Sequence, residues 1–191
     1  MSKKHDEVTK NDSKTVNLTV KQLTFCGLAI ALAFIASTYL KFSQLPYGGS
    51  VTFFSMLFIC FIGYLYGPKI GITTGIAYGI LQFVTEPYIV HPIQVVLDYP
   101  LAFGALGLAG FFHTQKYGLM KGYIAGVTAR YIVSVISGCV FFGEYAAEGQ
   151  TVLAYSLIYN GSYIIPEMIL TLAVIPLLNR GFVEVKKMAC A

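Results

Sequence analysis

Charged residues are scarce in this sequence of 191 residues: Asp, Glu, Lys and Arg make up only 12% of it, against about 25% in soluble domains. Tryptophan is absent, whereas hydrophobic residues reach 56% and the mean hydropathy is +0.68. This balance excludes an ordinary soluble domain and indicates an integral membrane protein. The net charge of +4 does not indicate a nucleic-acid partner, because the basic residues are scattered between hydrophobic segments and form no stripe.

Motifs for catalysis and for metal binding are missing as well. The chain contains no G-x-x-x-x-G-K-[ST] loop, so we do not expect it to hydrolyse ATP, and it contains neither H-E-x-x-H nor G-x-S-x-G. Cys26, Cys60, Cys139 and Cys190 have no paired spacing, which favours reduced packing residues over disulfides or a metal site. We therefore expect no enzyme, no metal and no cofactor.

Six apolar segments predict an all-α bundle of six transmembrane helices within residues 20–180. The second and third segments are shorter than the about 20 residues that usually span a bilayer. Residues 1–19 are polar and lack the apolar core of a signal peptide, so we expect a flexible tail there, and a short tail at 181–191. The segments cover residues 20–40, 51–66, 70–85, 93–112, 119–142 and 151–178.

Basic residues predict the orientation of these helices. With the N-terminus inside, eleven Lys and Arg residues fall on the cytoplasmic side and only Lys41 falls outside, while Arg130 lies within a segment. The positive-inside rule then predicts that both termini are cytoplasmic. The loops near 41–50, 86–92 and 143–150 would face outward.

Small residues indicate where helices touch. Gly71, Gly75 and Gly79 recur every four residues in the third segment, and such ridges let helix backbones approach closely in lipid. The first segment carries two small pairs, Gly27 with Ala31 and Ala29 with Ala33. One of these faces is expected to pack inside the bundle and the other against a second membrane protein.

Polar residues gather in the outer halves of the last three segments. Asp98 lies in an otherwise apolar run, where an ionisable group is costly and usually faces a bundle interior or a ligand. Helical spacing places Arg130, Ser134, Ser137 and Gly138 on one face, and a second face carries Ser156, Asn160, Tyr163 and Glu167. The simplest alternative is an internal network in which Arg130 neutralises Asp98 or Glu167. Two carboxylates against one guanidinium would still leave a negative excess for a ligand to answer.

Aromatic residues fill the same region, and each belongs either to an outer aromatic belt or to a ligand site. They are Tyr88, Tyr99, Tyr155, Tyr159, Tyr163, Phe141 and Phe142. His91 precedes Pro92 at a helix entrance, where a loop anchor is favoured over a ligand contact. These features favour a membrane subunit that binds a small molecule and takes its energy from elsewhere. Two alternatives stay open: a stand-alone carrier coupled to protons through Asp98 and Glu167, and a purely structural subunit.

Three stretches resemble a known family: GGSVTFF, HPIQVVLDYPLAFGALGLAGFF, and RYIVSVISGCVFFGEYAAEG followed by AYSLIYNGSYIIP. They are similar to the thiamin-binding S components of energy-coupling-factor transporters. The resemblance implies six helices that cross the bacterial cytoplasmic membrane and bind a vitamin at its outer face. It also implies partners, a transmembrane coupling protein and two cytoplasmic ATPases, with docking through small residues of the first helix such as Ala29 and Ala33.

Carried over by position, the resemblance implies ligand contacts at Asp98, Tyr99, Gly138, Tyr155 and Asn160. The aspartate and the asparagine would bond an aminopyrimidine, and Tyr155 would lie against a ring face. With Arg130, Ser134, Tyr163 and Glu167 these residues form the expected substrate site.

The sequence also departs from the family. Ser134 stands where thiamin binders often have histidine, Phe142 where some have tryptophan, and Gly49 and Phe53 where a tryptophan and a glutamate occur. Glu167 looks like an addition. An unmatched polar group costs about 1–3 kcal/mol and can shift specificity. The expected ligand is therefore thiamin or its hydroxymethylpyrimidine moiety, with a B6 vitamer of the pyridoxine type as the alternative.

Overall fold

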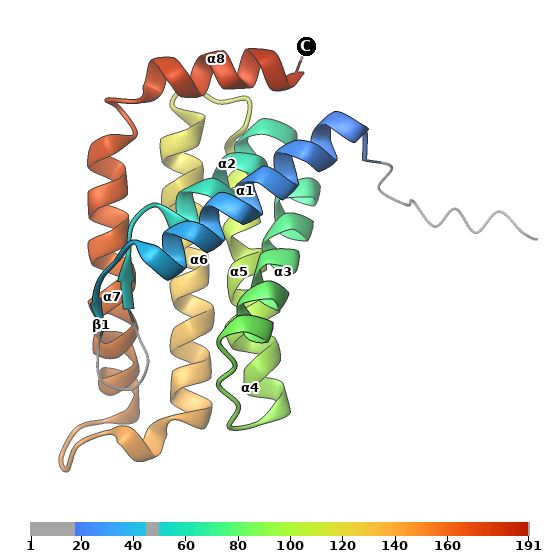
Figure 1. Cartoon of the computed structure of the whole chain (residues 1–191). Helices are drawn as coiled ribbons and strands as arrows, with labels where there is room; N and C mark the ends of the chain where they lie inside the picture. Colours follow the sequence, from blue (N-terminus) through green and yellow to red (C-terminus); the bar gives the residue numbers. More distant parts are fainter. Residues whose placement is uncertain (1–17, 45–49, 191) are drawn as a thin grey trace, which may run out of the picture.

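Helices form nearly all of the chain that the computed structural model describes, residues 18–44 and 50–190 (Figure 1). The expected tail at 1–19 and Gly49 lie mostly or wholly outside these residues. A two-stranded antiparallel hairpin, in which Gln44 pairs with Ser50, interrupts the helices. The helices are α1 (Val20–Tyr39), α2 (Ser55–Tyr66), α3 (Pro68–Thr85), α4 (Pro92–Val96), α5 (Ala102–Ala105), α6 (Gly118–Phe141), α7 (Val152–Val174) and α8 (Asn179–Cys190), and the strands are β1 (Lys41–Gln44) and β2 (Ser50–Thr52).

Four helical segments are long and apolar enough to cross a membrane, which confirms the coarse prediction of a helical membrane protein. They are α1, the segment Pro92–Phe112, α6 and α7. Pro92–Phe112 is continuous but changes its winding: α4 passes into a π-helix, η2 (Leu97–Leu101), and α5 passes into a 3₁₀ helix, η3 (Leu106–Phe112). A last 3₁₀ turn, η4 (Gly143–Tyr145), precedes α7.

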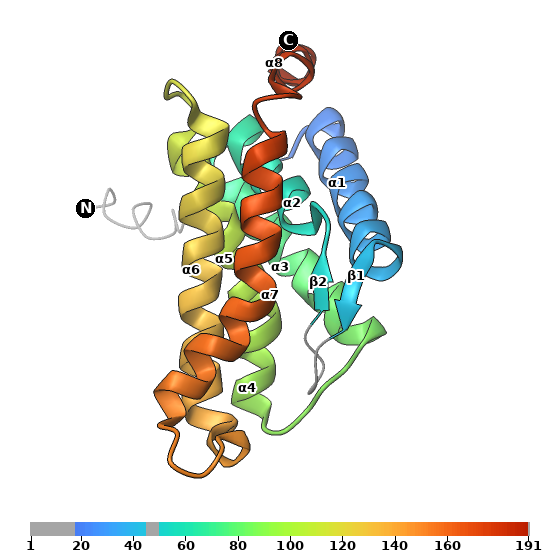
Figure 2. The same ribbon diagram turned by 90° about the vertical axis from the view of Figure 1, so that its left-hand side faces the viewer.

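The short helix α2 makes room for the hairpin. Its 12 residues rise only about 18 Å at roughly 1.5 Å per residue, which is less than the about 30 Å hydrocarbon core of a bilayer. Figure 2 shows β1 and β2 between α1 and α7, and β2 leads directly into α2. The hairpin therefore brings polar backbone and hydroxyl groups to the interior of the bundle.

Glycines bring α3 into backbone contact with the fourth segment. A Cβ added to Gly75 would lie 2.3 Å from the carbonyl oxygen of Phe103, and one added to Gly79 would lie 2.4 Å from that of Tyr99. A Cβ at Gly71 would meet the Cα of Gly63 at 2.7 Å. No side chain fits at these positions without displacing a helix, so this ridge packs inside the bundle and marks where helices touch, as its spacing predicted.

Ala29 and Ala33, which were expected to dock a partner protein, do not lie on a free surface of the structure. Their side chains are only 6% and 0% exposed, because this face of α1 packs into the protein's own core. The opposite face, with Gly27 and Ala31, is exposed. The spacing of small residues predicted two small faces without telling which one turns inward. The resemblance assigned docking to Ala29 and Ala33, which lie on the face that the structure buries.

The C-terminal segment, expected as a short tail, carries α8, which runs across the end of the bundle (Figure 1). Phe182 packs against Phe61 of α2 with ring centroids 5.1 Å apart. Lys186 donates to the carbonyl oxygen of His113 and lies 3.7 Å from the centre of the Tyr64 ring. Helix α8 is therefore fastened to the bundle by both apolar and polar contacts.

Candidate functional site

A cavity of about 460 Å³ lies among the helices and the hairpin, within the roughly 300–1,000 Å³ typical of small-molecule sites. All nine residues expected at the substrate site line it: Asp98, Tyr99, Arg130, Ser134, Gly138, Tyr155, Asn160, Tyr163 and Glu167. The structure thus brings together the polar faces of three helices. Contact of these residues with a ligand stays a prediction.

A π-helical turn positions Asp98. Pro100 has no backbone N–H and lies inside η2, where the N–H of Ala102 donates to the carbonyl oxygen of Leu97, five residues earlier. Such local widening of a helix is frequent at functional sites. The carboxylate of Asp98 accepts a hydrogen bond from Gln94 Nε2 at 2.5 Å, while Gln94 Oε1 accepts from the N–H of Val90.

Gln94 was missed in the sequence, although it stands four residues before Asp98 and so shares its helix face. Its side chain is 1% exposed, which makes it a buried positioning residue for the carboxylate. An i, i+4 pair of polar residues inside an apolar run was the signal that could have found it.

Aromatic side chains surround the mouth of the cavity. The ring of Tyr88 stacks on Phe142, with centroids 6.0 Å apart, and its hydroxyl lies 3.3 Å from that of Tyr145. This hydrogen bond raises the pKa of Tyr145 to about 12. Tyr99 accepts from the N–H of Tyr88 and donates to the carbonyl oxygen of Glu86, each at 2.9 Å. The aromatic side chains at the mouth are therefore held in place by stacking and by hydrogen bonds to one another and to the backbone.

A ladder of tyrosines follows α7 along the cavity. The rings of Tyr155 and Tyr159 are stacked 5.8 Å apart, and Tyr159 meets Tyr163 edge to face at 5.9 Å. Tyr163 donates to Asn160 Oδ1 at 2.7 Å, and Asn160 Nδ2 donates to the carbonyl oxygen of Ser156 at 2.9 Å. The asparagine amide is thus held in place by its own helix.

Helix α6 approaches α7 closely at Gly138. A Cβ there would lie 2.4 Å from Ser156 Oγ and 3.3 Å from Asn160 Nδ2. Only glycine allows the two polar faces to stand this close. The carry-over from the family gave this position as a ligand contact, and the structure gives it a packing role beside the cavity as well.

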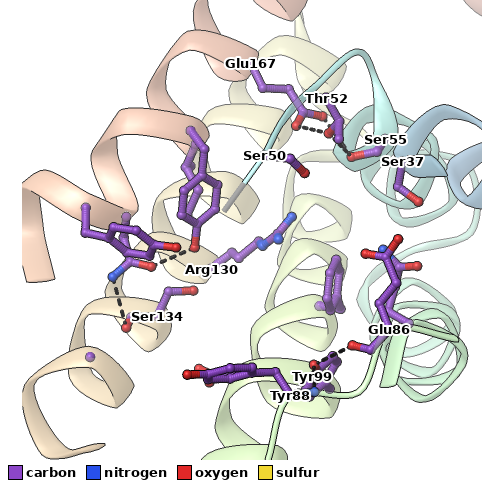
Figure 3. Close-up of a pocket in the computed structure, with 18 of the residues that line it drawn as sticks. Ser37, Ser50, Thr52, Ser55, Glu86, Tyr88, Tyr99, Arg130, Ser134 and Glu167 are labelled. Atoms are coloured by element: carbon purple, nitrogen blue, oxygen red, sulfur yellow. Dashed lines mark hydrogen bonds between the residues drawn. The ribbon is translucent and has the colours of Figure 1, made fainter. Parts of the chain in front are cut away.

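Arg130 makes no direct contact with the carboxylate of Asp98 or of Glu167 among the described residues. Its guanidinium lies over the ring of Phe103, 4.2 Å from the centroid. Figure 3 shows Arg130 reaching across the middle of the cavity, between Glu167 and Tyr99. Its Nε, like Ser156 Oγ, is buried and has no hydrogen-bond partner among the described groups. Buried polar atoms are rarely left so, which favours a guest molecule or water here.

Glu167 is held by the hairpin and by the start of α2. Its carboxylate accepts from Thr52 Oγ1 at 2.6 Å, from Ser55 Oγ at 2.9 Å and from the N–H of Met56 at 3.1 Å. The residue is 4% exposed and caps the first turn of α2, where a negative charge is favourable. Glu167 therefore joins α7 to the hairpin (Figure 3). Neither Thr52 nor Ser55 was identified as its partner from the sequence.

One ion pair crosses the mouth of the cavity. Lys41 Nζ of the hairpin lies 2.8 Å from Glu86 Oε1 of the loop after α3. The charges of Lys41 and Glu86 cancel each other. The other charged groups that line the cavity are the carboxylates of Asp98 and Glu167 and the guanidinium of Arg130. If all are ionised, the lining carries one negative charge in excess, which suits a cation.

His91 caps α4, as expected for a loop anchor. Its Nδ1 accepts from the N–H of Ile93, and its ring stacks on Phe141. The described part of the chain contains no group of three or more metal-ligating side chains. The arrangement suits non-covalent binding of a small aromatic molecule.

Three comparisons place the chain among known proteins. The family model described as thiamine transporter protein (Thia_YuaJ) matches residues 23–187. Thiamine transporter ThiT of Bacillus subtilis (strain 168) is 32% identical over 182 residues, covering 88% of this chain and 93% of that protein. Thiamine transporter ThiT of Lacticaseibacillus paracasei is 34% identical over 121 residues, covering 54% of this chain and 60% of that protein.

A solved structure agrees at the level of fold. ThiT from Listeria monocytogenes superposes with a TM-score of 0.68 at 24% identity, covering 87% of this chain and 94% of that one. The family model spans most of the sequence, including the stretches that carry the resemblance. The chain therefore belongs to the thiamine transporter family.

Proposed function

We propose that this chain is the substrate-binding S component of an energy-coupling-factor importer and that it binds thiamin. The observation that carries the proposal is the cavity in which Asp98, held by Gln94, faces a wall of tyrosines from α7. The names of the relatives support the choice of vitamin.

The chemistry of the lining fits the parts of thiamin. A carboxylate can accept from the exocyclic amine of an aminopyrimidine and bond its ring nitrogen, which assigns that task to Asp98. The flat ring would lie against Tyr155 or Phe142. The thiazolium ring carries one positive charge, which would balance the one excess negative charge of the residues that line the cavity.

The departures from the family keep specificity open within this class. Ser134 offers a hydroxyl on a short side chain where many relatives have an imidazole, and Phe142 offers a smaller ring than tryptophan. Phe53 does not line the cavity. Ser134 and Phe142 are both smaller than the side chains that they replace and offer fewer polar atoms, so hydroxymethylpyrimidine is the second candidate and a pyridoxine-type vitamer the third.

The proposed topology has six membrane crossings with both termini in the cytoplasm. It counts α1, α2 together with the hairpin that precedes it, α3, Pro92–Phe112, α6 and α7 as crossings. Seven of the nine described Lys and Arg residues lie at the end of the bundle that carries α8, and the positive-inside rule assigns this end to the cytoplasm. The cavity mouth with Glu86 and Tyr145 then faces outward, where an import substrate arrives.

The energy for transport would come from partners. The sequence contains no phosphate-binding loop, so a transmembrane coupling protein and two cytoplasmic ATPases are proposed to supply ATP hydrolysis. The exposed face of α1, and not the buried Ala29 and Ala33, is the part of this helix that a partner can reach.

Calorimetry on the purified protein tests the ligand. We expect tight binding of thiamin at one site per chain and weaker binding of hydroxymethylpyrimidine and pyridoxine. Sub-micromolar binding of pyridoxine with no response to thiamin would overturn the assignment of the vitamin. No binding of any of the three would overturn the proposed function.

A further inference from the structure

Helix α8 presents one face to the bundle and leaves the rest uncovered. Phe182, Val185 and Ala189 follow helical spacing, and Ala189 is buried with residues of α1 and α2. The opposite face carries Arg180, Glu184 and Lys187, all exposed. The helix is thus amphipathic and lies flat on the end of the bundle (Figure 1).

Apolar side chains flank this helix without protein to cover them. Leu177 and Leu178, in the turn that leads into α8, are 79% and 52% exposed, and Met188 on its flank is 59% exposed. Leu177 and Leu178 follow directly after the spanning helix α7, and Met188 lies near the C-terminal end of α8, which runs across the same end of the bundle (Figure 1). In a membrane protein this level corresponds to the boundary between acyl chains and headgroups.

Positive charge surrounds the same end. Lys69, Lys116 and Lys121 lie at the ends of neighbouring helices, and α8 adds Arg180 and Lys187. Among the described residues at this end, Glu184 is the sole carboxylate, and it pairs with Lys187 at 2.9 Å on the surface. An exposed pair of this kind is weak, so Lys187 is free to exchange its partner for a phosphate.

We propose that α8 is an interfacial helix that binds the anionic phospholipid headgroups of the cytoplasmic leaflet. Leu177, Leu178 and Met188 enter the acyl boundary, while Arg180 and Lys187 lie at the level of the phosphates, where basic side chains are attracted to anionic lipid. Lys186 takes no part, because its ammonium is bound to His113 and Tyr64 inside the protein. The assignment to the cytoplasmic leaflet rests on the orientation given under the proposed function.

The absence of tryptophan allows a direct test. Met188→Trp places a single fluorophore on the flank of α8 in the full chain, reconstituted in vesicles of phosphatidylcholine and phosphatidylglycerol. One of the two lipids is brominated on its acyl chains, so that it quenches a neighbouring indole. We expect brominated phosphatidylglycerol to quench about two-fold more than the same fraction of brominated phosphatidylcholine.

Two matched variants complete the test. Adding Arg180→Gln and Lys187→Gln should make the two lipids quench equally while quenching itself persists. Ile158→Trp, on the exposed side of α7, should be quenched without preference, because no basic cluster adjoins it.

Equal quenching of Met188→Trp by both lipids would overturn the proposal, since α8 would then select no headgroup. Absence of quenching by either lipid would also overturn it and would indicate that protein covers this flank. A thiamin titration of the unmodified chain and of the same variants distinguishes the two proposals. If the unmodified chain does not bind thiamin, that result contradicts the proposed function and leaves the lipid proposal to the quenching experiment.

Discussion

At the scale of single residues, the cavity is defined by polar side chains that stand within apolar spanning segments. Asp98, Asn160 and Arg130 stand out because polar side chains within a spanning segment need a reason, and all three line the cavity. Their partners were harder to predict. Gln94 and Thr52 look unremarkable in the sequence, and only the fold brings them to a carboxylate.

Asp98→Asn tests the proposed contact with the vitamin. The substitution removes a charged hydrogen-bond acceptor, an interaction worth about 1.5–3 kcal/mol, so thiamin affinity should fall about 10- to 100-fold. Calorimetry measures the change. Glu86→Gln is the matched control: it removes a carboxylate at the mouth that already pairs with Lys41, and affinity should change less than about three-fold. Equal losses in both variants would contradict the assignment of Asp98.

Gly138→Ala tests the close approach of α6 and α7. The added methyl would stand 2.4 Å from Ser156 Oγ and force the helices apart, at a cost of about 1–3 kcal/mol in the free energy of unfolding. Gly27→Ala is the control, since no atom lies within 4 Å of its added Cβ and a helix gains up to about 1 kcal/mol from alanine. Thermal unfolding in detergent measures the effect: the midpoint temperature should fall for Gly138→Ala and should not fall for Gly27→Ala.

At the scale of elements, apolar runs predicted the spanning segments, whereas changes of winding escaped prediction. The π-helical turn at Leu97–Leu101 depends on Pro100 and on packing against α3, and no periodicity reveals it. Helix α8 was missed for a different reason. Its three inward residues are spread over a polar segment, so composition alone indicated a tail.

Glu167 tests how the hairpin is joined to α7. Glu167→Gln exchanges an acceptor for an amide facing three donors, which should lower the free energy of unfolding by roughly 1–3 kcal/mol. Thr52→Val removes one of the same bonds, so the double variant should lose less than the sum. Glu184→Gln, on an exposed pair, should change stability by less than about 1 kcal/mol. Strict additivity of the first two would show that they act separately.

At the scale of the whole molecule, the family and the helical architecture followed from the sequence, and the position of α1 did not. A helix with small residues on two faces can turn either face toward the bundle, and in the structure the face with Ala29 and Ala33 is the buried one. Charge asymmetry is a property of the entire chain, and it supports the orientation more firmly than any single loop does.

Reconstitution distinguishes an S component from a stand-alone carrier. Vesicles that contain only this chain should bind thiamin but accumulate none when a proton gradient is imposed. Adding the coupling protein and the two ATPases with ATP should start accumulation. Uptake by the single chain would favour the proton-coupled alternative with Asp98 and Glu167.

The glycine contacts of α3 with the fourth segment have a consequence for motion. Backbones that touch without intervening side chains, as at Gly75 and Phe103, cannot separate without losing their whole interface, whereas α7 rests on α6 and on the short strand β2. Deuterium uptake by backbone amides should therefore be slowest in α3 and η3 and faster in α7. The side of the cavity formed by α3 and the fourth segment would then be rigid, and α7 would be the more mobile side beside the bound vitamin.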